Sequence, residues 1–264
     1  VTTENAGGGL FNWSAPTEFV KLPSKGQFYA PSHPLHQEDT VEIKYMTAKE
    51  EDILTNQNYI KNGTVIDKLL ESLVKGNVDL NEMLTGDKNA ILVAARILGY
   101  GADYSFNYPH PESGEMEEVT VDLTEANDKE LNEGLMINGK NEFEFELPFS
   151  KASLTFKLLT QADEKRIDDE IKGLKKINKQ SSTELTTRLK HIISSVNGDY
   201  TTKTIREFVD NKFLARDSRP FRNYALNIMP DINLDFDLVF SDGAISSDVS
   251  IPIGVGFFWP DTGI

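Results

Sequence analysis

The stretch DKNAILVAARILGYGADYSFNYPHPESGEMEEVTVDL at residues 87–123 has a second version in DSRPFRNYALNIMPDINLDFDLVFSDGAISSDVSIPI at residues 217–253. With a constant shift of 130 positions and no gap, Asp87 aligns with Asp217, and Phe106 aligns with Phe236. Few residues are identical, but the apolar positions and the order of the predicted elements agree. The sequence therefore predicts that one module occurs twice in the chain.

The similarity extends upstream of these two stretches. Leu22-Pro23 precedes a predicted strand at 41–46, and Leu147-Pro148 precedes one at 154–159. In the first copy we expect helices from Thr47, over 65–74 and over 88–98, and then a hairpin of strands 103–108 and 118–123. In the second copy we expect helices over 163–177, 184–196 and 202–213, a last helix with Pro220 in its first turn, and strands over 233–239 and 248–255.

These patterns predict an α+β fold of two pseudo-repeats, each with a strand, about three helices and a β-hairpin. The repeats should pack together because each is short for an independent core. We expect an N-terminal arm at 1–20, a first repeat at 21–123, a linker at 124–142 and a second repeat with an aromatic C-terminus at 143–264.

The composition narrows the function classes. The 264 residues carry a formal net charge of −15, which disfavours binding to nucleic acid or to an anionic membrane surface. The absence of cysteine excludes disulfides and thiolate metal sites. No apolar run approaches the roughly 20 residues of a membrane helix, and the first residues lack the pattern of a secretory signal.

Residues that could carry chemistry are scattered. Among the histidines only His33 and His36 are close, and Pro34 between them disfavours a helical i, i+3 ligand pair, so a loop without function explains them better than a metal site. The chain has no nucleophile elbow, zinc-protease motif or phosphate-binding loop. Asp231, Asn233, Asp235 and Asp237 begin like a calcium loop, but Phe236 stands where that loop requires glycine. A charged, solvent-facing strand edge explains these acids better. We therefore predict no catalytic residues, no metal and no cofactor.

Three segments are candidates for contacts with a partner. The apolar residues of the arm either fold back on the chain or dock on a neighbour, and the C-terminal aromatic residues either pack in the core or insert into a partner. The arginines near Asp217 either pair within the chain or anchor an interface. The predicted partner-binding residues are Leu10, Phe11, Trp13, Arg219, Arg222, Phe257, Phe258 and Trp259.

Six segments together carry a resemblance to a known family. They lie at residues 19–26, 45–54, 96–101, 158–164, 217–231 and 251–260, and include the stretches YMTAKEEDIL, RILGYG and FFWP. In this order and spacing they resemble the baseplate hub assembly proteins of T-even-type contractile-tailed phages. The resemblance implies a structural or assembly role in a tail baseplate, with other hub proteins and the tape measure protein as candidate partners, and assembly in the host bacterial cytoplasm.

One departure from this family concerns the two hairpin tips. Relatives carry paired cysteines there, like small zinc knuckles, but the tips at 108–114 and 240–244 contain none. Zinc is not predicted, and turn residues such as Gly114 and Gly243 should hold the tips. Two alternatives to a permanent hub component stay open: a transient assembly chaperone that is absent from the virion, and a hub-associated cell-wall hydrolase.

Overall fold

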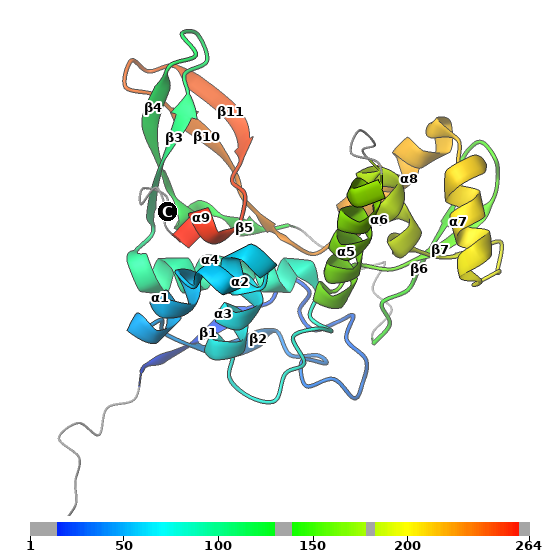
Figure 1. Ribbon diagram of the computed structural model, residues 1–264, viewed down its shortest axis with the longest axis horizontal. Coiled ribbons are helices and arrows are strands. Elements are labelled where there is room, and N and C mark those ends of the chain that lie inside the picture. The colour runs from blue at the N-terminus through cyan, green and yellow to red at the C-terminus, as the bar shows by residue number, and fades with distance from the viewer. Residues whose placement is uncertain (1–14, 130–138, 178–182, 259–264) are drawn as a thin grey trace, which may run out of the picture.

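The computed structural model describes residues 15–129, 139–177 and 183–258. Within these ranges the chain consists of helices and small antiparallel sheets (Figure 1). The α+β class predicted from the sequence is confirmed. None of the described helices is both long and apolar enough to cross a membrane.

The first half of the chain surrounds a long buried helix, α4. Strands β1 and β2 pair antiparallel, short helices follow, and α4 leads into a hairpin. The elements are β1 (Thr17–Lys21), β2 (Thr40–Lys44), α1 (Ala48–Leu54), α2 (Gln57–Asn62), α3 (Val65–Leu73), α4 (Thr85–Tyr100), β3 (Asp103–Pro109), β4 (Met116–Asp122), η1 (Leu123–Glu125) and β5 (Asn127–Asp128).

The second half repeats this order of strand pair, helices, long helix and hairpin. Its elements are β6 (Phe143–Glu146), β7 (Ser153–Phe156), α5 (Gln161–Ile177), α6 (Glu184–Ile192), β8 (Ile193–Val196), α7 (Thr202–Asn211), α8 (Ala215–Ile228), β9 (Ile232–Asn233), β10 (Asp235–Val239), β11 (Ile245–Ser250) and α9 (Val255–Phe258). The recurrence of the order agrees with the duplication, while the boundaries assigned to the repeats stay a prediction.

The first helix of the first half begins with the predicted capping box. The backbone N–H and the hydroxyl of Thr47 donate to the Glu50 carboxylate at 2.8 and 2.7 Å. Lys44 Nζ and Ser72 Oγ each donate to the other oxygen of Glu50 at 2.6 Å. This fully buried carboxylate therefore joins β2, α1 and α3.

The same arrangement opens α5 in the second half. The N–H and hydroxyl of Thr160 donate to Asp163 at 3.2 and 3.0 Å, and Lys157 Nζ lies 2.8 Å from both oxygens of that carboxylate. The spacing of lysine, threonine and acid is identical in the two halves. The match in both spacing and contacts supports the duplication.

A second pair of matching contacts involves the aligned aspartates. Asp87 accepts from the backbone N–H of Ser24 at 2.9 Å, and Asp217 accepts from the N–H groups of Phe149 and Ser150 at 2.8 and 3.1 Å. Both aspartates are fully buried and lie in the first turn of a long helix. Each therefore ties its helix to the turn that follows a Leu-Pro pair.

Glu50 should make the stability of the protein sensitive to acid. Burial alone would raise its pKa, but hydrogen bonds from Lys44, Ser72 and Thr47 outweigh burial and lower the pKa to about 2. Because the folded pKa lies below the ordinary value of 4.5, the stabilisation is complete above that value and is lost as the pH falls toward 2. Between pH 6 and pH 3 the wild type should lose about 2 kcal/mol of unfolding free energy relative to Glu50→Gln, measured by urea denaturation. A difference between the two proteins that stays constant with pH would contradict this.

The two halves share one hydrophobic core and direct hydrogen bonds. The backbone N–H of Gln161 donates to the Met83 carbonyl at 2.9 Å, and the Thr85 hydroxyl donates to the Leu159 carbonyl at 3.2 Å. The C-terminal hairpin of the second half lies beside the hairpin of the first half, above α4 (Figure 1). The repeats therefore interlock.

The two hairpins contact each other near their tips. The Ser241 N–H donates to Glu117 at 2.7 Å, and His110 Nε2 lies 3.2 Å from Asp242 Oδ2. The His110 ring also meets Phe240 nearly edge-on, with centroids 4.9 Å apart. Besides the turn glycines expected from the sequence, side-chain contacts between the hairpins hold these tips.

Two expectations about the connecting segments need correction. Strand β1 begins at Thr17, inside the range assigned to the arm, because Val20 is buried and pairs with Val41. The range assigned to the linker contains β5, which pairs with β9 through Asn127 and Asn233. Residues 1–14 and 130–138 lie outside the described part of the chain.

Two helix boundaries also differ from those expected. The helix predicted over 184–196 ends at Ile192, because the next four residues form β8 on the edge of β7. Helix α8 begins at Ala215, so Pro220 lies inside the helix and not in its first turn. Its ring has no N–H to donate to the Arg216 carbonyl. The short helix α2 has no counterpart among the predicted elements.

Candidate functional site

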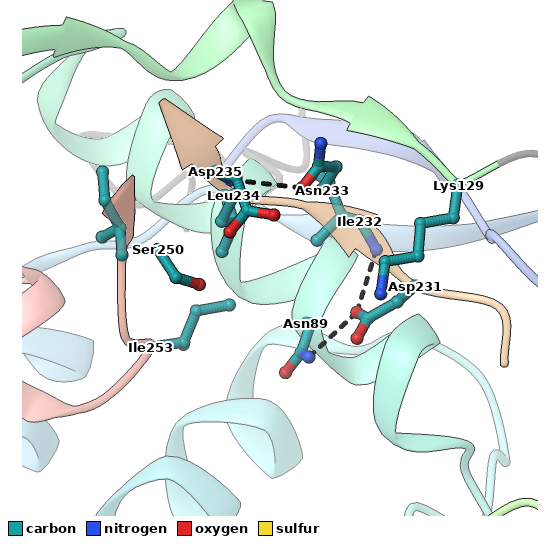
Figure 2. Close-up of a pocket in the computed structure, with 10 residues that line it drawn as sticks. Asn89, Lys129, Asp231, Ile232, Asn233, Leu234, Asp235, Ser250 and Ile253 are labelled. Carbon is teal, nitrogen blue, oxygen red and sulfur yellow. Dashed lines mark hydrogen bonds between the residues drawn. The ribbon is translucent and has the colours of Figure 1, made fainter. Parts of the chain in front are cut away.

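A polar pocket lies where α4, β5 and the β9–β10 segment meet (Figure 2). Its volume is about 290 Å³, and Lys129 lies on its rim. Asp231 accepts from the Asn89 amide at 3.1 Å and from the Ile232 N–H at 2.9 Å, while Asn233 at the end of β9 accepts from the Asp235 N–H at the start of β10. The Asn89–Asp231 hydrogen bond therefore ties the chain entering β9 to α4, while the other two bonds are local turns of that chain.

The alternating polar residues at 231–237 run through β9 into β10, and the absence of a metal there stays a prediction. Within the described residues, no group of three or more histidine, cysteine or acidic side chains is placed to hold a metal ion. Asp235 and Asp237 are exposed, whereas the alternating Leu234, Phe236 and Leu238 are buried. This pattern fits a strand with one charged face.

The strongly perturbed ionisable groups near α4 have structural surroundings. Burial raises the pKa of Asp87, although Ser24 and Tyr29 donate to its carboxylate. Burial lowers the pKa of Lys88, against the attraction of Asp67 and other acids. Because Asp87 is fully buried among hydrogen-bond donors, its shifted pKa reflects its role inside the fold.

The second concave feature is an apolar groove between α6 and α8, with β7 at its base. Its volume is about 460 Å³. Leu185 on α6 and Leu226 on α8 are 48% and 56% exposed at its rim, so apolar surface continues outside the cavity. The apolar lining consists of Phe156, Leu158, Leu159, Leu185, Leu189, Ile192, Phe221, Ala225, Leu226 and Met229.

Three arginines line this groove, and their environments differ. Arg188 donates to both oxygens of Glu164 at 2.9 Å, a bidentate pair that raises the pKa of the guanidinium. Arg219 and Arg222 form no ion pair with any residue in the described ranges, and Arg222 Nε is buried without a hydrogen-bond partner there. Among the described residues, the groove therefore carries two cations that no carboxylate neutralises.

The structure separates the arginines that the sequence grouped together. The Cζ atom of Arg216 lies 4.6 Å from the centroid of the Phe149 ring. The neighbouring Asp217 carboxylate accepts hydrogen bonds from the backbone N–H groups of residues 149 and 150. Arg219 and Arg222 instead face the groove. Asp217 is therefore used by backbone N–H groups of the chain itself, and Arg216 by the Phe149 ring. Interface anchoring stays a prediction for Arg219 and Arg222.

The aromatic residues near the C-terminus are buried by the chain itself. Phe257 and Phe258 are 1% and 2% exposed, and the Phe257 ring lies 5.1 Å from that of Tyr104. Core packing thus describes both rings here, and a role in partner binding stays a prediction that requires the segment to leave its place. The other predicted anchors, Leu10, Phe11, Trp13 and Trp259, lie outside the described residues.

Sequence reasoning missed the apolar wall of the groove. A signal was present, because Arg222, Ala225, Leu226 and Met229 recur at helical spacing. This stripe adjoins the fully buried Phe221, which also lines the groove, so the apolar surface of α8 continues from the core into the groove.

Comparison with models of known families assigns the chain to a protein family. A sequence model of the T4 bacteriophage base plate protein family matches residues 15–239, which is most of the chain. The chain therefore belongs to this family of phage baseplate proteins, and the resemblance predicted from the sequence is confirmed at that level. Comparisons with curated proteins and with solved structures found no match.

Proposed function

We propose that this protein is a structural or assembly component of the hub of a contractile-tail baseplate and works by protein–protein contact, without catalysis. The observation that carries the proposal is membership of the T4 baseplate family over residues 15–239. The groove between α6 and α8, where Arg219 and Arg222 make no ion pair within the described residues, provides a surface suited to such contacts.

The proposed partners are other proteins of the baseplate hub, with the tape measure protein as a further candidate. A net charge of −15 favours protein partners over phosphate backbones or anionic lipid surfaces, because like charges repel. The proposed location is the baseplate of the virion tail, reached after assembly in the cytoplasm of the host bacterium.

Quantitative mass spectrometry of purified mature particles tests this function, with a known baseplate protein as the internal scale. We expect a fixed number of a few copies per tail, and cross-links to hub proteins in the same particles. Near absence from particles, together with abundance in infected-cell lysate, would replace the permanent component by a transient assembly chaperone. Cross-links confined to proteins outside the hub would overturn the hub assignment.

A further inference from the structure

We propose that the groove between α6 and α8 binds an amphipathic helix of a partner protein, with an apolar stripe flanked by glutamate or aspartate. This inference rests on the proposed function and specifies the chemistry of the partner. The groove joins an apolar lining, two helical walls and two arginines that make no ion pair with the described residues.

The apolar side chains have the spacing of a helix-binding surface. On α6, Leu185, Leu189 and Ile192 lie at i, i+4 and i+7. On α8, Ala225 and Met229 are one turn apart, and the small Ala225 side chain allows a close approach. The 14 residues of α8 extend about 21 Å, which gives a third helix several turns of contact in the helix-in-groove mode.

The charges at the groove select an acidic partner. The chain has 42 acidic and 27 basic residues, so most charged side chains near any cation are acidic. Arg188 is neutralised by Glu164, but Arg219 and Arg222 have no such carboxylate within the described ranges. A buried guanidinium nitrogen without a partner is costly, and a carboxylate supplied by a bound helix would remove that cost.

Two other occupants fit the groove less well. A small apolar carboxylate would fill the cavity but leave Leu185 and Leu226 exposed, because they extend the apolar surface beyond it. A second copy of this chain would bring together two proteins of charge −15, which repel each other. A separate acidic helix covers the rim leucines and still satisfies the arginines.

The test uses the full chain and three fluorescently labelled synthetic peptides of about 18 residues, a length that supports helix formation. The first has leucines at i, i+3, i+4 and i+7 with glutamates on the flanks, the second has lysines in place of the glutamates, and the third has scrambled leucines. Fluorescence anisotropy should show binding of the glutamate peptide, with affinity at least about tenfold higher than for either other peptide.

Protein variants then locate the binding. The double variant Arg219→Gln/Arg222→Gln should weaken binding of the glutamate peptide about tenfold or more, and Ala225→Trp should abolish it by filling the groove. Lys203→Gln is the matched control, because it removes an exposed cation outside the groove and should leave binding unchanged. Circular dichroism and thermal melting verify that each variant is folded.

Several results would overturn the inference. Equal binding of the glutamate and lysine peptides would exclude charge selection, and binding unaffected by Ala225→Trp would place the site elsewhere. Laurate binding that Ala225→Trp removes, without peptide binding, would identify a small apolar carboxylate as the occupant. Concentration-dependent dimers that Ala225→Trp abolishes would identify a second copy.

Failure of this inference can be distinguished from failure of the proposed function. If the wild type is present in particles while Arg219→Gln/Arg222→Gln is incorporated equally well and the peptides do not discriminate, the groove inference fails and the hub function stands. If the wild type is absent from particles, the structural hub function fails, whereas the peptide titration still tests the groove.

Discussion

Replacement of Asp87 by alanine is expected to lower the free energy of unfolding by about 4 kcal/mol. Asp87 is fully buried and accepts from the Ser24 N–H at 2.9 Å, from the Ser24 hydroxyl at 2.6 Å and from the Tyr29 hydroxyl at 2.7 Å. The Tyr29 hydroxyl in turn accepts from the Leu84 N–H at 3.0 Å. Alanine at residue 87 leaves buried donors without an acceptor, each at a cost of about 1–3 kcal/mol.

Urea denaturation at neutral pH measures this effect against two further variants. Asp87→Asn keeps the shape of the side chain but only one acceptor oxygen, so the free energy of unfolding should fall by a smaller amount, about 2 kcal/mol. Asp169→Ala removes an exposed helical carboxylate and should change stability by no more than about 0.5 kcal/mol. If Asp87→Ala were as stable as Asp169→Ala, the network around Asp87 would have no net role in stability.

Replacement of Gly86 by alanine is expected to lower the free energy of unfolding by about 3 kcal/mol. A Cβ at this position would overlap the carbonyl oxygen of Pro230 and crowd the Asp231 backbone. The glycine is therefore needed for the close approach of α4 to the chain entering β9. Because the atoms in the way belong to the backbone, they cannot move aside as easily as the end of a flexible side chain could. The Asn89–Asp231 hydrogen bond in the same region should also be lost.

Gly173→Ala provides the control, and its expected effect on the free energy of unfolding has the opposite sign. Gly173 lies within α5, and a Cβ there has no neighbour within 4 Å. Alanine should stabilise that helix by about 0.5–1 kcal/mol, because glycine is the poorer helix former. Thermal melting of the two variants should therefore show opposite shifts, and equal shifts would contradict the role assigned to the close approach at Gly86.

Local sequence patterns predicted many elements because their signals are short-range. The Thr47–Glu50 capping box, the hairpin at 103–122 and the amphipathic α3 depend on residues a few positions apart. Strand β8 was missed because its pairing with Leu154 involves residues some forty positions away. The four residues of β8 by themselves carry no pattern that distinguishes a strand from a continuation of the helix.

The candidate site was predicted only in part, for a similar reason. Arg219 and Arg222 were identified because arginines are conspicuous in an acidic chain, but Arg216, from the same run, stacks on Phe149 instead. Phe257 was considered as an anchor because of its apolar ring, yet it packs against Tyr104. Whether an apolar or charged side chain is free depends on neighbours that are distant in the chain.

By itself, the sequence determined the α+β class, the recurring order of elements, the aligned Asp87 and Asp217, and the baseplate family. The first three properties are carried by periodicity, capping and spacing, which operate over short distances along the chain, whereas the family is carried by the resemblance of several sequence segments to its members. Only the tertiary structure decided how the repeats interlock and that α6 and α8 border an apolar groove. It also decided which arginines make an ion pair within the described residues, because burial and charge pairing depend on distances in space that local sequence does not specify.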